Sequence, residues 1–390
     1  MNYDFSTETD RRNTGSVKWS GVKSSDPDNF SYPLSMADME FVTPPEIRKA
    51  CTEFAERGFY CYTGGDNAYR KDVCDFMLRR HNWEIKPEWI VNTFGIVGAL
   101  HTAVKAFTEE GDGIITTPPV YAHFYHAARY TGRTLVNVPL VIENNRYEIN
   151  FGELEKACKN PKNKMLIFCS PHNPTGRVWT REELKKTVKL CKDNGVFIVS
   201  DEIHFDITCK EHTVIATVGD YSENCMICTA ISKSFNIAGL ATSNIIIPSD
   251  EKRELFSRQL TDDGYSCINA FAYPATHAAY NFCDEWLDNM NAVINRNFEI
   301  FEKALREDMP KIGFCPREGT YLAWLDVSCF NIPEGKDYSE FFEENTGFIP
   351  QSGDWFEGNG NTHIRANLAI PESTLMRFIA SLKECYDKFV

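Results

Sequence analysis

Short apolar runs and segments with helical periodicity alternate along the middle of this chain. Apolar runs with the length of buried strands occur near residues 89–92, 113–117, 134–138, 165–169, 196–200, 226–231 and 244–247. Helical patterns lie between some of them, at about residues 95–109, 181–194 and 252–260. This alternation predicts a mostly parallel sheet that is covered by helices on both faces.

The two ends of the chain follow different patterns. An extended arm is predicted for residues 1–45, and helices are predicted for residues 46–57 and 69–81. Residues 270–309 predict one or two long helices, and the tail adds strands near 320–326 and 363–368 and a closing helix from Glu372. A chain of 390 residues is long for a single hydrophobic core, so we expect two domains.

Composition and charge narrow the class of protein. The residues are 43% hydrophobic and 25% charged, as in an ordinary globular protein, and the formal net charge is −14. This charge, without any run rich in lysine or arginine, argues against nucleic-acid binding. No apolar run approaches the roughly 18–20 residues that span a bilayer, and the first residues lack the features of a signal peptide. We therefore expect a cytoplasmic protein that binds neither nucleic acid nor membrane.

The fourteen cysteines are scattered, and several of them follow apolar residues. In a chain without a secretion signal, this favours reduced and mostly buried thiols over disulfides. Cys225 and Cys228 form a C-x-x-C pair on a predicted strand, but no second pair stands at a zinc-like spacing. A structural role is the simpler interpretation, and we predict no metal site.

Three polar side chains follow three of the predicted strands. Asn173, in an Asn-Pro-Thr-Gly turn, follows the first of these strands, Asp201 the second and Lys233 the third. Ligands of open α/β sheets collect outside the carboxyl ends of the strands, so these side chains can converge on one site. Each residue is ordinary alone, because proline and glycine favour turns and acidic residues are common after strands. The ordered set is far more specific than any of its members.

Lys233 is the most informative of the three. It lies between Ile231 and a largely apolar segment from Phe235 to Leu240. Burial in such surroundings disfavours the charged ammonium form. This suits a lysine whose neutral amine attacks a carbonyl group or is held as a Schiff base. The alternative is a lysine that snorkels to solvent from the end of a strand.

At these residues the chain resembles the pyridoxal-phosphate (PLP) enzymes of the aspartate-aminotransferase fold, and within them the cystathionine β-lyase or C–S lyase branch. The resemblance spans about residues 5–388 and rests on the segments 37–41, 170–179, 200–204, 232–240 and 364–369. It implies an α/β fold, with a mostly parallel sheet flanked by helices in a large PLP-binding domain and a smaller α+β domain. The implied division is residues 1–45 for an N-terminal arm and part of the small domain, 46–285 for the large domain and 286–390 for the C-terminal small domain.

The resemblance implies roles for the residues that follow the strands. Lys233 is expected to bind PLP covalently and to act as the base that removes the Cα proton of the substrate. Asp201 is expected to pair with the protonated pyridine nitrogen. Asn173 and His204 are expected to bind the phenolic oxygen of the ring, and Asn173 also to lie at the substrate. These roles explain Asp201 and His204 better than a metal cluster with Asp206 does.

Other residues are implied to hold the cofactor. Tyr121 matches the aromatic residue that stacks on the ring, although a tyrosine in a turn is often only packing. The phosphate is expected at the helix that starts at Ile96 and Val97, where free N–H groups and the helix dipole favour anions, with a hydroxyl from Ser232. Tyr62 matches a tyrosine that reaches the phosphate of the partner subunit, which implies a homodimer with shared active sites.

The substrate side of the site is implied in the same way. Arg365 is the expected clamp for the α-carboxylate, because a guanidinium fork matches a carboxylate bidentately; a structural ion pair is the alternative. Residues 37–39 are expected to close over the substrate. The chain departs from the family at Ala230 and Ala241, where many relatives carry a serine and an arginine for the phosphate. It also has Ser35 where the branch usually has tryptophan.

The reaction that the resemblance implies is β-elimination from cystathionine or a related cysteine S-conjugate, which yields a thiol, pyruvate and ammonia. An aminotransferase that acts on an amino acid and a 2-oxo acid is the alternative, because both reactions begin with removal of the Cα proton. A binding or regulatory protein that keeps the fold without turnover is a third possibility. The joint presence of Lys233, Asp201, Asn173 and Arg365 disfavours it.

Overall fold

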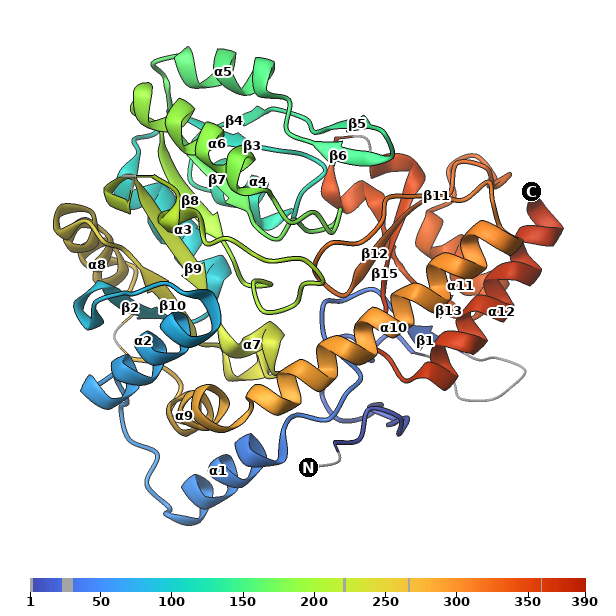
Figure 1. Cartoon of the computed structure of the whole chain (residues 1–390), viewed down its shortest axis with the longest axis horizontal. Coiled ribbons are helices and arrows are strands. Elements are labelled where there is room, and N and C mark those ends of the chain that lie inside the picture. Colours follow the sequence, from blue (N-terminus) through green and yellow to red (C-terminus); the bar gives the residue numbers. More distant parts are fainter. Residues whose placement is uncertain (1–2, 23–30, 220–221, 266, 359) are drawn as a thin grey trace.

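The largest element of the molecule is a seven-stranded sheet in the order β2-β10-β9-β8-β7-β3-β4 (Figure 1). The structure is a computed structural model that describes residues 3–22, 31–219, 222–265, 267–358 and 360–390. The strands are β2 (Ile90–Thr93), β3 (Gly113–Thr116), β4 (Thr134–Asn137), β7 (Asn163–Cys169), β8 (Phe197–Asp201), β9 (Cys225–Thr229) and β10 (Ser243–Ile246). Five of them pair in parallel, whereas β10 is antiparallel to both β9 and β2. The prediction of a mostly parallel sheet is confirmed.

Helices cover both faces of this sheet, because the central strands are apolar on both sides. On β7, Met165 and Ile167 pack into one hydrophobic cluster, and Leu166 and Phe168 into another. The first cluster includes residues of α3 (Ile96–Phe107), α4 (His123–Arg129) and α8 (Asp250–Asp262). The second includes residues of α1 (Pro45–Glu56), α2 (Asn67–His81), α5 (Phe151–Lys159), α6 (Arg181–Asp193), α9 (Ala272–Phe282) and α10 (Asp284–Asp308).

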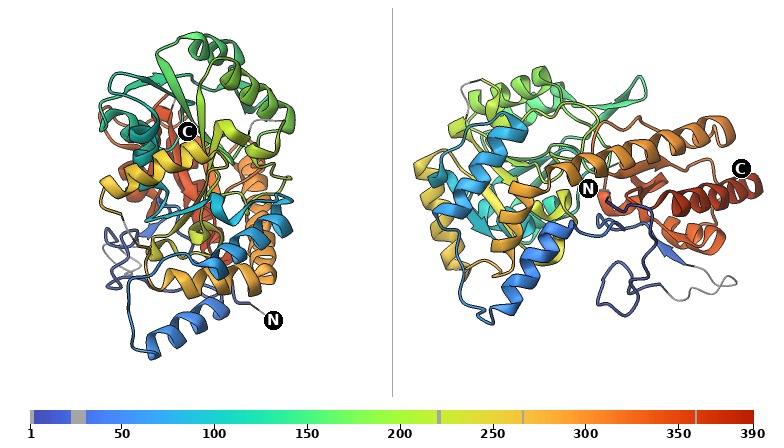
Figure 2. Two further views of the ribbon diagram at one scale, coloured as in Figure 1. Left: turned by 90° about the vertical axis from the view of Figure 1, so that its left-hand side faces the viewer. Right: turned by 60° about the horizontal axis from the view of Figure 1, so that its bottom comes forward.

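A smaller antiparallel sheet forms in the C-terminal part of the chain, in the order β11-β12-β15-β14. Its strands are β11 (Gly313–Phe314), β12 (Leu322–Asp326), β14 (Gln351–Ser352) and β15 (His363–Asn367), and α11 (Tyr338–Thr346) and α12 (Glu372–Phe389) pack beside it. Strand β1 (Tyr32–Pro33) pairs in parallel with β13 (Phe348–Ile349), which joins the N-terminal arm to this part. The long helix α10 extends along both parts of the molecule (Figures 1 and 2). We keep the division into residues 1–45, 46–285 and 286–390 as a proposal.

The structure differs from the predicted elements in a few places. The apolar run at residues 226–231 leaves the sheet after Thr229, and Ile231 begins the one-turn helix α7 (Ile231–Ser234). Ala230 and Ile231 are buried outside the sheet, so the pattern did not mark the end of the strand. Lys233 therefore lies on a short helix. Helices α4 and α5 and the hairpin of β5 (Val141–Glu143) and β6 (Arg146–Glu148) were not predicted.

Within the described ranges, no helix has both the length and the apolar character of a bilayer-spanning segment.

Candidate active site

The sheet brings the three predicted polar residues to one edge. Strands β7, β8 and β9 are neighbours and run in parallel, so their carboxyl ends lie side by side. Asp201 is the last residue of β8, while Asn173 and Lys233 each come four residues after the end of their strand. Because β2 is antiparallel to β10, which is antiparallel to β9, β2 also ends at this edge. The first turn of α3 follows there.

Lys233 is partly buried on α7, and its Nζ donates a hydrogen bond of 2.6 Å to the carbonyl oxygen of Ala37. Burial lowers the pKa of Lys233 to about 8. The negative charges of Asp38 and Asp201 oppose this shift, and the positive charge of Arg365 adds to it. The amine is therefore close to losing its proton at neutral pH, which suits a nucleophile or a general base.

Asp201 is buried, with 6% of its surface exposed. Burial raises the pKa of its carboxyl group to about 7, although the backbone N–H of Ile203 donates to Oδ1 at 3.2 Å and the charge of Lys233 lowers the pKa. A carboxylate in this position gains stability from a further cation, because the present partners do not compensate for its desolvation.

Arg365 lies on β15, opposite Trp324 of β12, and is 4% exposed. Its Nη1 donates to Asn173 Oδ1 at 3.0 Å and its Nη2 to the carbonyl oxygen of Ser35 at 2.5 Å. The guanidinium carbon lies 4.8 Å from the centre of the Phe356 ring, and the buried Nε has no hydrogen-bond partner. Among the described residues, no carboxylate forms a salt bridge with Arg365, and burial lowers its pKa to about 10. The structure thus joins Arg365 to Asn173 and leaves its charge without an anionic partner.

His204 and Tyr121 have the burial expected of groups that face a cofactor. His204 is 3% exposed, and burial lowers its pKa, so the imidazole is neutral. Its ring packs edge-on against Tyr321 at 5.5 Å, and the buried Nδ1 has no partner. Tyr121 is partly buried, and its ring lies 5.2 Å from that of Trp355. Burial raises the pKa of Tyr121 to about 12.

The predicted phosphate site is the start of α3. Ile96 and Val97 are its first two residues, and the preceding Gly95 has a φ of 88°. No side chain caps this end of the helix, so its first N–H groups have no capping acceptor. Ser232 stands next to Lys233 on α7. These placements fit an anion site, and the roles of Ile96, Val97 and Ser232 stay predictions.

Tyr62 does not enter the site of its own chain. Its side chain is 96% exposed, and the neighbouring Phe59 and Tyr60 are 74% and 61% exposed. The prediction that Tyr62 acts on a partner subunit is not tested by a single chain. No group of three or more metal-ligating side chains lies close together in the described residues, and Cys225 and Cys228 are both buried in β9.

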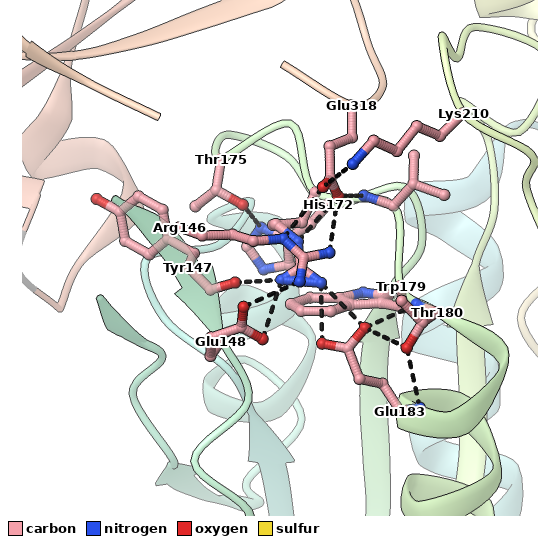
Figure 3. Close-up of polar contacts among 12 residues, drawn as sticks. Arg146, Tyr147, Glu148, His172, Thr175, Trp179, Thr180, Glu183, Lys210 and Glu318 are labelled. Carbon is pink, nitrogen blue, oxygen red and sulfur yellow. Dashed lines mark hydrogen bonds and ion pairs between the residues drawn. The ribbon is translucent and has the colours of Figure 1, made fainter. Parts of the chain in front are cut away.

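Arg177 is the centre of a cluster of ion pairs beside the turn that carries Asn173, and the sequence did not predict this cluster. Figure 3 shows its members Glu148, Glu183 and Glu318 near His172. Arg177 is 1% exposed and pairs with Glu318, Glu183 and Glu148, with N–O distances of 3.0, 2.8 and 3.3 Å. The His172 N–H donates to the Arg177 carbonyl oxygen at 2.8 Å, which closes the turn. The cluster therefore ties the Asn173 turn to the C-terminal part of the chain.

Glu318 is the member of this cluster that comes from the C-terminal part. Besides Arg177, it accepts from Lys210 at 2.8 Å, from Arg146 at 3.1 Å and from the backbone N–H of Val178 at 3.0 Å. The only local sequence signal was the position of Arg177 directly after the Asn-Pro-Thr-Gly turn. Its acidic partners could not be identified from that position.

Comparisons with known proteins agree with this geometry. The model of the family described as "Aminotransferase class I and II" matches residues 32–340. The chain is 36% identical to cystathionine β-lyase PatB of Bacillus subtilis (strain 168), over 98% of this chain and 99% of that protein. It is 29% identical to protein MalY of Escherichia coli (strain K12), over 97% and 98% of the two chains.

Solved structures give the same result. Cystalysin from Treponema denticola, whose crystal structure contains PLP, matches with a TM-score of 0.94 and 36% identity, over 100% of both chains. The PLP-bound C–S lyase from Staphylococcus hominis matches with a TM-score of 0.92 and 32% identity, over 99% of this chain and 98% of that chain. The predicted fold is confirmed, and the chain belongs to the family of class I and II aminotransferases.

Proposed function

We propose that this protein is a PLP-dependent C–S β-lyase that cleaves cystathionine or a related cysteine S-conjugate. The observation that carries the proposal is one edge of the large sheet, where a lysine with a lowered pKa, a buried carboxylate with a raised pKa and an arginine without an anionic partner lie together. Relatives of this chain that are similar over nearly their whole length are named as cystathionine β-lyase and C–S lyase.

The residues of the site fit PLP. Asp201 lacks a cation that compensates for its burial, and a protonated pyridine nitrogen supplies one. His204 Nδ1 is buried without a partner, and the Asn173 side chain carries an amide N–H₂ group that can donate to the phenolic oxygen. The uncapped start of α3 offers N–H groups to the phosphate. Lys233 would hold the cofactor covalently through its amine.

When bound, PLP stabilises the negative charge that forms on the Cα atom of an amino acid. Arg365 binds the α-carboxylate through its two terminal nitrogens, and Asn173 holds one of them in place. Lys233, whose amine is largely available as a base above pH 8, takes the Cα proton. Asp201 keeps the pyridine nitrogen protonated.

Elimination then depends on the group at Cβ. A thiolate leaves with the electron pair of the Cβ–S bond and takes up a proton. The remaining three-carbon unit adds water and breaks down to pyruvate and ammonia. With cystathionine the thiol is homocysteine, so one molecule of water is consumed for one each of homocysteine, pyruvate and ammonia.

An aminotransferase is the second candidate. The family takes its name from that reaction, and the relatives include a probable aspartate/prephenate aminotransferase of Aquifex aeolicus at 25% identity over 90% of this chain. An aminotransferase expels no group from Cβ, and it requires a 2-oxo acid for turnover.

One experiment separates the two. Purified protein with PLP is incubated with cystathionine, and pyruvate and free thiol are measured with and without added 2-oxo acid. We expect pyruvate and thiol in equal amounts and no dependence on the 2-oxo acid. Lys233→Ala should abolish turnover, and borohydride reduction followed by mass spectrometry should place the cofactor on Lys233. Turnover that requires a 2-oxo acid would favour the aminotransferase, and an adduct on another lysine would exclude the proposed site.

A homodimer in the cytoplasm is part of the same proposal. The exposed side chains of Phe59, Tyr60 and Tyr62 support a partner surface, and a chain with many buried cysteines suits a reducing compartment. If Tyr62 acts across the interface, a Tyr62→Asp subunit and a Lys233→Ala subunit should form heterodimers with one working site. Mixtures that stay inactive after verified subunit exchange would contradict this role.

A further inference from the structure

The segment Leu34–Phe41, here called the strap, contacts both cations of the proposed active site through its backbone. The carbonyl oxygen of Ser35 accepts from Arg365 Nη2 at 2.5 Å, and that of Ala37 accepts from Lys233 Nζ at 2.6 Å. Both acceptors are carbonyl oxygens, so the identity of the two side chains does not set these contacts. The path of the strap determines where the lysine amine and the arginine fork lie.

The part of the N-terminal arm that precedes the strap holds it from one side through a buried ion pair. Lys18 Nζ donates to the carbonyl oxygen of Asp38 at 2.7 Å and lies 2.7 Å from Glu40 Oε1. The side chains of Lys18 and Glu40 are 0% and 1% exposed. Trp19 Nε1 donates to the same carboxylate at 3.1 Å. The carboxylate that neutralises Lys18 thus belongs to the strap itself.

A second, more exposed cation of the arm adds to this pair. Arg11 Nη2 lies 3.0 Å from Asp38 Oδ2, and Arg11 Nη1 donates to the carbonyl oxygen of Met39 at 3.2 Å. The side chains of Arg11 and Asp38 are 25% and 29% exposed. Arg11 therefore holds Asp38 and Met39 of the strap, but in contact with solvent.

Two asparagines hold the strap from the other side. Asn236 accepts from the Met39 N–H at 3.0 Å and donates to the carbonyl oxygens of Met39 and Phe41. Asn367, at the end of β15, donates to the carbonyl oxygens of Met36 and Asp38 at 2.8 Å each. Asn236 follows α7, which carries Lys233, and Asn367 lies two residues after Arg365. Arg11, Lys18 and Trp19, by contrast, hold the strap from outside the proposed active site.

The buried pair of Lys18 and Glu40 is a costly way to stabilise a fold. Desolvation of two charges offsets much of their attraction, and well-packed apolar side chains of the same volume often serve a core at least as well. Here the ammonium also binds a carbonyl oxygen of the strap, and its charge acts on Lys233, whose pKa it lowers. These additional contacts point to a purpose beyond stability.

We propose that Lys18 and Glu40 are positioning residues, which hold the strap so that its carbonyl oxygens fix the Arg365 fork and the Lys233 amine for an amino-acid substrate. The proposal rests on the proposed function for its kinetic consequence. Its structural consequence, the order of the strap, is independent of the reaction that the enzyme catalyses. Lys18 and Glu40, which do not touch the reacting atoms, thereby act on the active site through the strap.

The test compares the PLP-loaded wild type with Lys18→Met and with the double variant Lys18→Met/Glu40→Leu. The double variant removes both charges of the pair, so neither is left buried without its partner, but the contact of Lys18 with Asp38 is lost. We expect both variants to raise the KM for cystathionine about tenfold while PLP affinity stays as in the wild type. Hydrogen exchange followed by mass spectrometry should be faster by a factor of ten or more in residues 34–41.

Two matched controls separate positioning from general loss of stability. Lys49→Met removes an exposed lysine of α1, and Leu154→Ala opens the core at α5, away from the arm. Leu154→Ala should lower the melting temperature without changing the KM or the exchange of residues 34–41. If it changes both as Lys18→Met does, or if both strap variants match the wild type in KM and exchange, the proposal is wrong.

A third variant tests the proposal if Lys18→Met and the double variant do not fold. Arg11→Gln acts at the exposed end of the same contacts, and we expect a smaller rise in KM and in strap exchange. Wild-type values for Arg11→Gln would then overturn the proposal. If the wild-type enzyme does not release pyruvate from cystathionine, the proposed function is wrong, and strap exchange still tests the positioning residues.

Discussion

Two buried arginines, Arg177 and Arg365, have opposite surroundings although both contact the turn that carries Asn173. Arg177 is enclosed by three carboxylates, and each of its three nitrogens makes at least one hydrogen bond. Arg365 makes its hydrogen bonds and its ring contact with neutral groups, namely Asn173, the Ser35 carbonyl and the Phe356 ring, and its buried Nε has no hydrogen-bond partner. Asn173, in the turn that precedes Arg177, is a direct partner of Arg365.

This difference distinguishes buried charged side chains that stabilise the fold from those that we propose bind a ligand. A buried charge whose hydrogen bonds are all made holds its surroundings in one arrangement. A buried charge with an unmet donor is costly for folding, and such groups concentrate at sites that receive a ligand. The burial of Asp201, His204 and Lys233 is also not fully compensated, since it displaces the pKa of each one. The Arg177 cluster holds the turn on which one part of that site depends.

The largest effect should come from breaking the saturated cluster. Arg177→Met leaves Glu318 and Glu183 with less compensation in a buried position, and loss of one partner from a buried ion pair typically costs about 3–5 kcal/mol of stability. We expect the urea midpoint of unfolding to fall accordingly. The folded fraction should keep a kcat within a few-fold of the wild type. Arg258→Met, at an exposed ion pair of α8, is the matched control.

The distinction between a structural Arg177 and a functional Arg365 is wrong if Arg177→Met lowers kcat strongly while the urea midpoint stays the same. A wild-type urea midpoint together with a hundredfold loss of kcat would place Arg177 among the functional residues. The carboxylates around it would then have to be in contact with the substrate.

The opposite pattern is expected for Asp201→Asn. Removal of a preorganised charge partner costs about 2.7–4 kcal/mol of transition-state stabilisation, so kcat should fall a hundredfold or more. Stability should not fall. The folded pKa of Asp201 is about 7, above the value of about 3.9 in an unfolded chain, so its charge destabilises the fold increasingly as pH rises from about 4 to about 7.

The destabilising effect of the Asp201 charge can be measured in protein without PLP, where no pyridine nitrogen compensates for it. PLP-free Asp201→Asn should be more stable than the PLP-free wild type at pH 8, and the two should converge near pH 4. Thermal unfolding at several pH values checks this, with Asp193→Asn at an exposed site of α6 as control. A variant that is less stable than the wild type at pH 8 would show that the Asp201 charge is already compensated by the protein.

Arg365→Lys should affect substrate binding without affecting the fold. A lysine offers one point charge in place of a planar fork, and charged hydrogen bonds are worth about 1.5–3 kcal/mol, or roughly ten- to a hundredfold in KM. PLP affinity and the urea midpoint should stay close to the wild type, because the fork has only neutral partners in the protein. An unchanged KM for cystathionine would exclude the carboxylate clamp.

Part of the proposed site follows from local pattern. Apolar runs that end at polar residues predict Asn173, Asp201 and Lys233 as candidates, and the parallel pairing of β7, β8 and β9 places these three residues at one edge. The short helix α7 was not predictable, because burial outside the sheet continues the apolar pattern of β9. The antiparallel direction of β10 was not predictable either, because an apolar run does not show in which direction a strand pairs.

Contacts between distant segments also could not be predicted from the sequence. The pairing of Arg177 with Glu318, and of Lys18 with Glu40, depends on the packing of segments whose apolar pattern carries no information about charge partners. Tyr62 is a different case, since its predicted role requires a second subunit.

The smallest effect concerns the proton on Lys233. Its pKa of about 8 means that the neutral amine rises from about a tenth to about nine-tenths between pH 7 and pH 9, whereas an ordinary lysine, with a pKa near 10.4, stays almost fully protonated there. In PLP-free protein, limiting acetic anhydride should therefore label Lys233 with a midpoint near pH 8. Lys71 is the internal comparison, because it is exposed and its hydrogen bond to Asp75 raises its pKa. Quantitative peptide mass spectrometry measures both profiles in one sample. Burial is the main cause of the shift, so Lys233 should react slowly but with the earlier midpoint; a shared midpoint above pH 10 would mean that the protein does not prepare this amine to act as a base.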